Sequence, residues 1–271
     1  MDLSPQVAAL ARRVGVSFEV VHPLRSTNNV VLWLEPSDVV AKVHQDRGRA
    51  ETELKVAAAL AEIGAPVIPP AESYGSPVYN LERSCVTFWR YASQAGMPSP
   101  TSHAIGVALH DLHIALRQVG EGLELPAAEV EMQAVLGVLG SPGNTPELEA
   151  DDRRLLQAAL RSAVDLLTSP VTSTSTIHGA PHRNNILVVD GCPRFIDFET
   201  VCQGPVEWDL AHLEPEVAES YPQPVDSARL EACRLAVSAK TSAACWANLH
   251  RGADMQFHAE HHLAVVRSAL T

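Results

Sequence analysis

The sequence lacks any apolar run that approaches the roughly 20 residues a membrane-spanning helix requires. It also lacks an excess of positive charge, because 20 Lys and Arg stand against 32 Asp and Glu and the formal net charge is −12. Nucleic acid needs a basic surface for its phosphates, so neither a membrane nor a nucleic-acid partner is expected. Cysteine is scarce, with no CxxC pair and no metal-ligand spacing, which predicts free, buried thiols. The five positions are Cys85, Cys192, Cys202, Cys233 and Cys245.

The first 16 residues, MDLSPQVAALARRVGV, lack the pattern of a signal peptide, because an acid stands at position 2 and two Arg interrupt the apolar stretch. We therefore expect a cytoplasmic protein. What is present is typical of a folded globular chain: 271 residues, 46% hydrophobic and 19% charged, enough to bury a substantial core. The negative charge mildly favours a cationic small-molecule ligand.

Short runs rich in β-branched residues open the chain and predict an antiparallel sheet, since turn-prone segments separate them. The expected strands are 17–22, 29–34, 38–44, 71–74 and 84–89. Between the third and fourth strands, alanine, leucine and glutamate recur at helical spacing from about 48 to 63, and Gly64 and Pro66 end this helix.

After a polar loop at 92–101 the pattern becomes helical, interrupted by a hairpin at 186–196. The expected helices are about 101–119, 127–138, 146–168, 226–250 and 254–269. This order predicts an α+β fold with two lobes, a β-rich lobe at 1–91 and a helical lobe at 92–271. The crevice between two lobes is the natural ligand site.

Polar residues of a recognisable kind gather at the ends of the predicted hairpin. Asn185 precedes the apolar run of its first strand, the turn Asp190-Gly191 follows, and Asp197 comes directly after the returning strand. A hairpin folded in this way brings Asn185 and Asp197 to the same end of a two-stranded ribbon. Amide and carboxylate oxygens are ligands that Mg²⁺ prefers, so the pair is a candidate magnesium site.

The same segment resembles the aminoglycoside phosphotransferase family, which shares the protein-kinase fold. The family's HGDxHxxN is matched by HGAPHRNN at 178–185, its IDF(E/G) by IDFE at 196–199 and its GPxxWDLA by GPVEWDLA at 204–211. The resemblance implies transfer of the γ-phosphate of ATP to a hydroxyl of a small molecule, with ATP and Mg²⁺ as cofactors. It also implies that Asp209 braces the catalytic loop through hydrogen bonds.

One side chain of the family motif is missing, because Ala180 stands where the motif keeps its carboxylate base. Three interpretations stay open. The protein transfers phosphate slowly, with His182 or Glu199 orienting the acceptor, since positioning and electrostatics supply most of phosphoryl transfer. Alternatively, it is a pseudokinase-like protein that binds nucleotide or a small ligand without turnover, or Ala180 is an engineered substitution. His178, at the start of the motif, completes the candidate catalytic set.

The resemblance further implies a lysine on the third strand that pairs with a glutamate of the following helix. Lys42, within VVAKV at 39–43, occupies that position. Glu53 is its expected partner, because it heads the apolar face of the helix, and Glu51 is the alternative.

Two further segments complete the implied nucleotide site. The phosphate-covering loop would be 25–29, which has no glycine but offers hydroxyl and amide groups at Ser26, Thr27 and Asn28. Trp89 and Tyr91 lie where the family places the hinge that contacts adenine, although an ordinary core strand end accounts for them equally well.

The remaining histidines are expected to be structural, since they lack a second cluster of ligands. His113 has the context of a core-facing helix residue, and His258, His261 and His262 that of a solvated face. The phosphate acceptor stays open among aminoglycosides, amino alcohols, sugars and other antibiotics, because fold does not fix substrate. The choice of ATP or GTP and the oligomeric state also stay open.

Overall fold

The structure is a computed structural model, and it describes residues 3–26, 29–71, 74, 77–170 and 172–270. The chain forms two compact units. The first unit comprises Met1–Leu123 and His182–Val201, and the second comprises Glu124–Pro181 and Cys202–Thr271. The division into these two units does not test the expected lobe boundary after residue 91, which stays a prediction.

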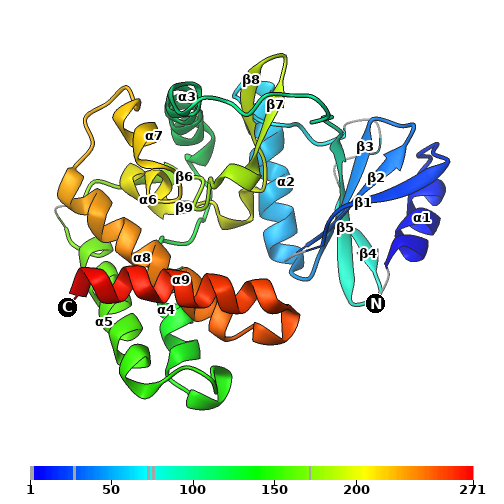
Figure 1. The fold of residues 1–271 in the computed structure, drawn as a ribbon. Helices are drawn as coiled ribbons and strands as arrows, with labels where there is room; N and C mark the ends of the chain where they lie inside the picture. Colours follow the sequence, from blue (N-terminus) through cyan, green and yellow to red (C-terminus); the bar gives the residue numbers. More distant parts are fainter. Residues whose placement is uncertain (1–2, 27–28, 72–73, 75–76, 171, 271) are drawn as a thin grey trace. The chain divides into compact units, whose positions relative to one another are not determined.

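The first unit is built on a five-stranded antiparallel sheet with the order β1-β2-β3-β5-β4 (Figure 1). Its strands are β1 (Val20–Ser26), β2 (Val30–Glu35), β3 (Val39–His44), β4 (Tyr79–Leu81) and β5 (Ser84–Arg90). β3 lies in the middle, and all six of its residues are buried. Four of the five expected strands are confirmed within a few residues.

The expected strand at 71–74 is not the one that pairs with β5, because β4 takes that place. Ala71 and Tyr74 lie outside the strands, and residues 72 and 73 lie outside the described part of the chain. Ala71 instead donates its backbone N–H to the carbonyl of Phe88 beside the sheet, at 3.0 Å. Ala71 and Tyr74 pack against the core of the sheet without forming a strand.

Three long helices belong to the first unit: α1 (Ser4–Arg13), α2 (Arg47–Glu62) and α3 (Ser102–Gly120). α1 packs its apolar face against one side of the sheet, where Val7 and Leu10 share a core with Leu32 and Leu34. α2 follows β3 directly and begins at Asp46, whose side chain accepts the backbone N–H of Arg49.

The first unit also contains the predicted hairpin, as β7 (Ile186–Val189) and β8 (Cys192–Phe195). Its two-residue turn has positive φ at both positions, 52° at Asp190 and 75° at Gly191. Asp-Gly suits this conformation, in which the turn follows the twist of the two strands. Single turns of 3₁₀ helix flank the hairpin, η3 (Arg183–Asn185) before it and η4 (Phe198–Thr200) after it.

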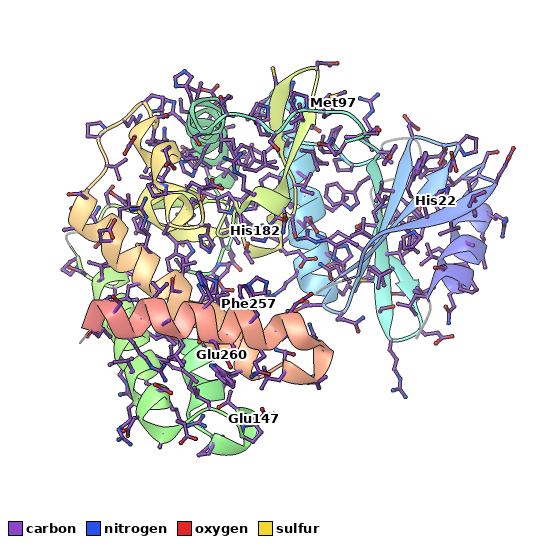
Figure 2. The ribbon with its side chains drawn as sticks, viewed as in Figure 1. His22, Met97, Glu147, His182, Phe257 and Glu260 are labelled. Carbon is purple, nitrogen blue, oxygen red and sulfur yellow. The ribbon has the colours of Figure 1, made fainter. Side chains whose placement is uncertain are left out.

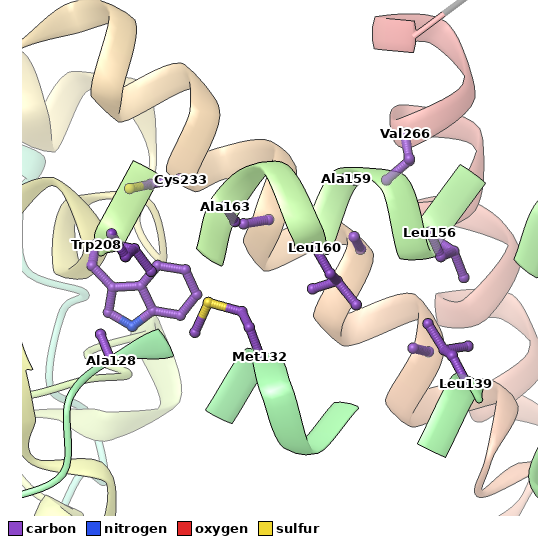
Figure 3. Packing of buried hydrophobic residues seen from close by; sticks show 14 of the residues in the cluster. Ala128, Met132, Leu139, Leu156, Ala159, Leu160, Ala163, Trp208, Cys233 and Val266 are labelled. Atoms are coloured by element: carbon purple, nitrogen blue, oxygen red, sulfur yellow. The ribbon is translucent and has the colours of Figure 1, made fainter. Parts of the chain in front are cut away.

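The second unit is helical, with a core shared among α4 (Glu129–Leu139), α5 (Ala150–Leu167), α8 (Ser227–Trp246) and α9 (Ala253–Leu270). Figure 3 shows this core, in which Met132 and Leu160 pack together with Trp208. The expected helices are confirmed. The sequence did not reveal the short helices α6 (Val206–Leu210) and α7 (Pro215–Glu219), nor the strand pair β6 (Ser175–Ile177) and β9 (Cys202–Gly204), because three to five residues show no period.

The β-rich and helical parts confirm the expected α+β class. Among the residues that the structure describes, no helix has the length and apolar character that a membrane crossing requires. His113 is fully buried, as predicted. On α9, Glu260, His258 and His261 are exposed, and Phe257 beside them is 66% exposed (Figure 2).

The prediction of buried thiols is right for four cysteines and wrong for Cys192. Cys192 is exposed because it is the first residue after the tight turn of the hairpin, on a ribbon of only two strands.

Candidate active site

The hairpin brings Asn185 and Asp197 together, as their spacing predicted. Ile186 pairs with Phe195 at the open end of the ribbon, and the backbone N–H of Ile196 donates to the carbonyl of Asn185 at 3.0 Å. Asp197 follows in the left-handed conformation, with φ 73° and ψ 63°. This conformation is uncommon for a residue other than glycine, and such backbone strain collects at functional sites.

The ammonium of Lys42 is the centre of a buried ionic cluster. Its Nζ lies 2.8 Å from both carboxylate oxygens of Glu53 and 2.8 Å from Oδ1 of Asp197. Glu53 is therefore the partner from α2, and the alternative Glu51 instead forms a surface ion pair with Arg47. The arrangement joins the middle strand, the following helix and the candidate metal ligand in one set of contacts.

Glu199 is the third carboxylate of this cluster. Its Oε1 lies 3.2 Å from Nζ of Lys42, 2.6 Å from Nδ1 of His44 and 2.8 Å from Nδ2 of Asn29. Nε2 of His44 also contacts Oγ1 of Thr87 at 2.7 Å. Glu199 is thus held by three donors, Lys42 and His44 of β3 and Asn29 just before β2.

The cluster perturbs the pKa of three side chains, Lys42, Glu53 and Glu199. Burial opposes the charged form of Lys42, but Glu53, Asp197 and Glu199 outweigh it and raise the pKa of the ammonium. Burial raises the pKa of Glu53 to about 8, with Lys42 acting in the opposite direction. For Glu199, burial is outweighed by the hydrogen bonds of His44 and Asn29 and by the charge of Lys42, which lower its pKa to about 2. One ammonium therefore lies among three acidic side chains, of which Glu53 keeps its proton up to a pH of about 8.

A cavity of about 390 Å³ opens beside this cluster, and all its lining residues belong to the first unit. Six predicted site residues line it: Lys42, Glu53, Trp89, Tyr91, His182 and Asp197. Its volume falls within the range of small-molecule sites. His182, which follows the loop that holds Ala180, is one of the side chains labelled in Figure 2.

The two aromatic residues of the expected hinge are both anchored. The indole N–H of Trp89 donates to Oγ1 of Thr87 at 2.7 Å, and the ring of Tyr91 stacks on Trp33 with centroids 4.3 Å apart. The apolar side chains of Val40 and Trp89 line the same cavity. This end of the cavity can accept a flat, apolar ring.

The expected phosphate-covering loop is described only at its ends. Ser26 closes β1 opposite Val30, and Thr27 and Asn28 lie outside the described residues. Before them, Nη1 of Arg25 donates to Oδ1 of Asn185 at 3.2 Å, and after them Asn29 donates to Glu199. Neither of these contacts was predicted from the sequence, and no role was assigned to His44, although His44 stands two residues after Lys42 and therefore on the same face of β3.

The chemistry of the donor set suits a divalent cation. The Lys42 ammonium lies at Oδ1 of Asp197 and the Arg25 guanidinium at Oδ1 of Asn185, so both oxygens already attract positive charge. A second set, His44, Glu53 and Glu199, has ligand atoms within 4.8 Å of one another. The ammonium of Lys42 lies against both of those carboxylates, so it already occupies the centre of that set.

In the second unit, Asp209 braces the loop that leads to Ala180. Its carboxylate accepts the backbone N–H of His178 at 2.8 Å and of Gly179 at 2.7 Å, and the indole N–H of Trp208 donates to the carbonyl of Gly179 at 3.0 Å. His178 is fully buried and its Nδ1 receives the backbone N–H of Ala180 at 3.4 Å. These contacts hold the loop in place, and the side chain at position 180 is a methyl group.

The chain belongs to the phosphotransferase enzyme family, whose model matches residues 20–246. Solved structures of the same kinase-like fold include amicoumacin kinase in complex with AMP-PNP, Ca²⁺ and Ami, with a TM-score of 0.75 and 12% identity over 100% of this chain and 94% of that chain. The GDP complex of wild-type aminoglycoside 2'-phosphotransferase-IIIa matches with a TM-score of 0.70 and 12% identity over 99% of both chains.

A choline/ethanolamine kinase family protein from Mesorhizobium loti matches with a TM-score of 0.66 and 15% identity over 97% of this chain and 94% of that chain. No curated protein sequence matches the chain significantly. The family match confirms the resemblance drawn from the motifs, and the solved structures confirm the kinase-like fold.

Proposed function

We propose that the protein transfers the γ-phosphate of a nucleoside triphosphate, ATP in the first instance, to a hydroxyl of a small molecule. The observation that carries the proposal is the contact of Lys42 with both Glu53 and Asp197 beside a cavity of about 390 Å³. A lysine held in this way can meet nucleotide phosphates, while the neighbouring carboxylate can meet their metal ion. The nucleotide-binding lobe would be residues 1–91, and the lobe with the catalytic loop residues 92–271.

Each residue of the site has a distinct task in this proposal. Asn185 and Asp197 would hold Mg²⁺, which when bound neutralises charge on the phosphates. Lys42 would bind the phosphates, and Glu53 fixes its position by accepting two of its hydrogen bonds. Trp89 and Tyr91 would contact the base, at the apolar end of the cavity.

The acceptor hydroxyl must be oriented without a carboxylate at Ala180. Of the two candidates for this task, Glu199 is already engaged by Lys42, His44 and Asn29. His182 lines the cavity and is the better candidate. General-base help contributes about 10²–10⁴-fold to a rate, so its loss predicts slow transfer rather than none.

Ala180 also favours a second candidate, a pseudokinase-like protein that binds nucleotide or a small ligand without turnover. The two candidates share the nucleotide site and differ only in the acceptor step. The contacts of Asp209 with the catalytic loop support either one, because they would be retained whether or not the loop still catalyses.

The acceptor is proposed to be a hydroxylated, cationic small molecule. The names of similar structures include an amicoumacin kinase, an aminoglycoside phosphotransferase and a choline/ethanolamine kinase family protein. The formal net charge of −12 would attract a cationic acceptor over a distance of about 10 Å at moderate salt.

Turnover measurements on the native protein and on Ala180→Asp separate the two functions. ATP consumption is followed with a panel of hydroxylated amines, including aminoglycosides and choline. Acceptor-dependent consumption by both proteins, faster for Ala180→Asp, supports the enzyme. Consumption by Ala180→Asp alone supports the pseudokinase, and the absence of consumption by both with every acceptor contradicts the transferase proposal.

A further inference from the structure

Arg25 brings a guanidinium to the candidate metal site. Its Nη1 lies 3.2 Å from Oδ1 of Asn185, and Arg25 itself lines the cavity together with Lys42 and Asp197. The register of β1 shifts between Pro23 and Arg25, so the strand has a bulge at this point. Bulges re-aim side chains next to binding sites, and this one lies directly before the expected phosphate-covering loop.

A second cation would balance the negative charge of the cluster and of a bound nucleotide better than Lys42 alone. The ammonium of Lys42 lies within 3.2 Å of three acidic side chains, Glu53, Asp197 and Glu199, and the ring of His44 also contacts Glu199. A nucleoside triphosphate brings further negative charge into the cavity, where a low dielectric constant makes charges interact strongly. The acidic side chains around Lys42 already offset the charge of its ammonium, so the ammonium compensates little of the charge of the phosphates. Mg²⁺ supplies part of the missing positive charge, and a cation of the protein next to the metal ligands would supply more.

We propose that Arg25 binds the terminal phosphates of the nucleotide and gives up its contact with Asn185 when the metal ion binds there. Two cations at one carbonyl oxygen repel each other, so Mg²⁺ at Asn185 would displace the guanidinium. The planar guanidinium fits two phosphate oxygens at once and stays charged at any physiological pH. The inference rests on the proposed nucleotide site.

Among the described residues, the other arginine that lines the cavity is a poorer candidate. Arg90 ends β5 at the expected hinge and is exposed. It pairs across the sheet with Val39, whereas Arg25 contacts a candidate metal ligand directly. The phosphates follow the metal, so the cation at Asn185 is the one placed to receive them.

The test compares affinities along a series of ligands with increasing phosphate number. Dissociation constants for adenosine, MgADP and MgATP are measured by calorimetry for the native protein and for Arg25→Ala and Arg25→Lys. Arg83→Ala is the matched control, because Arg83 is exposed in the turn between β4 and β5 and does not line the cavity. Thermal unfolding of each variant checks that the fold is retained.

Arg25→Ala is expected to weaken the binding of MgATP about 10- to 100-fold, because charge-assisted hydrogen bonds are lost. The affinity for adenosine is expected to stay unchanged. Arg25→Lys is expected to recover part of the loss, and Arg83→Ala to bind like the native protein. With Mn²⁺ alone, Arg25→Ala is expected to bind at least as tightly as the native protein, because the competing guanidinium is gone.

If the native protein binds MgATP and Arg25→Ala binds it equally tightly, this inference is wrong and the proposed function still stands. An equal loss for adenosine and MgATP would also overturn it, since the residue would then act through the fold. Absence of MgATP binding by the native protein itself would instead remove the proposed function, and this inference with it.

Discussion

The ammonium of Lys42 lies 2.8 Å from each carboxylate oxygen of Glu53, with the two residues 7% and 1% exposed. The lysine comes from the middle strand of the sheet and the glutamate from the helix that follows. A contact so deeply buried is costly to leave half-made, because the remaining polar or charged group has no water to solvate it. The pair therefore contributes to the stability of the first unit and also forms part of the proposed nucleotide site.

Lys42→Met is expected to lower the free energy of unfolding by about 3 kcal/mol, since it leaves three carboxylates together without their cation. Urea denaturation followed by circular dichroism measures the change. Lys55→Met is the control, because Lys55 lies on α2 and is exposed, and it is expected to change the free energy of unfolding by less than about 0.5 kcal/mol. Equal changes in the free energy of unfolding for the two substitutions would show that the buried cluster contributes no more to stability than an exposed lysine does.

The stability of the protein is expected to fall as the pH rises from about 5 to about 8. The pKa of Glu53 is about 8 in the folded chain and near 4.5 when unfolded, so between these values the folded state binds more protons. Raising the pH then favours the unfolded state, by up to about 1.4 kcal/mol per pH unit for one group. The pKa of Glu199 is about 2, so its contribution to stability changes with pH only below about 4.5, where that stabilising contribution is lost as the pH falls.

Urea denaturation at intervals between pH 5 and pH 9 measures this trend, and Glu53→Gln isolates the contribution of one residue because its side chain does not titrate. The native protein is expected to lose more stability than Glu53→Gln over this range. Parallel pH profiles for the two proteins would contradict the assignment to Glu53.

Asp209→Ala is expected to destabilise the second unit by about 2 to 6 kcal/mol, because the buried N–H groups of His178 and Gly179 lose their acceptor. Asp209→Asn keeps one carbonyl oxygen and is expected to cost less. Asp165→Ala is the control, since Asp165 is exposed on α5. The comparison is again made by urea denaturation, and a neutral Asp209→Ala would show that the loop does not depend on this carboxylate.

One thiol is expected to react quickly with a disulfide reagent such as DTNB in the native protein. Cys192 is exposed, whereas the other four cysteines are buried. Burial also raises the pKa of Cys233 to about 12 and that of Cys202 further, so these side chains form almost no thiolate at neutral pH. Cys192→Ser is expected to remove the fast phase, and its persistence in that variant would contradict the burial of the remaining thiols.

Local sequence patterns were enough to predict contacts between site residues that are close to one another in the sequence. Asn185 and Asp197 were predicted to meet because a hairpin with an Asp-Gly turn joins them, whereas Lys42 was implied by the family resemblance, which places a lysine on the third strand. The choice between Glu53 and Glu51 depended on which face of α2 meets the sheet, and the structure settles it.

Contacts between distant segments could not be predicted in the same way. Arg25 and Asn185 are 160 residues apart, Asn29 and Glu199 170, and no local period relates them. Only His44 carried a signal that was missed, since it shares with Lys42 the face of β3 that meets Glu199. The short strand pair β6 and β9 was likewise invisible, because its two strands of three residues pair across a long stretch of chain.

The most direct test of the account is the dependence of ATP binding on Mg²⁺ and on Asp197. Calorimetric titration of the native protein with ATP is made with Mg²⁺ and again with EDTA, and then repeated with Asp197→Ala. The account predicts binding by the native protein that weakens more than about tenfold when Mg²⁺ is removed or Asp197 is replaced, because an excess of carboxylates repels the bare phosphates. Absence of binding with Mg²⁺, or binding that neither change weakens, would contradict it.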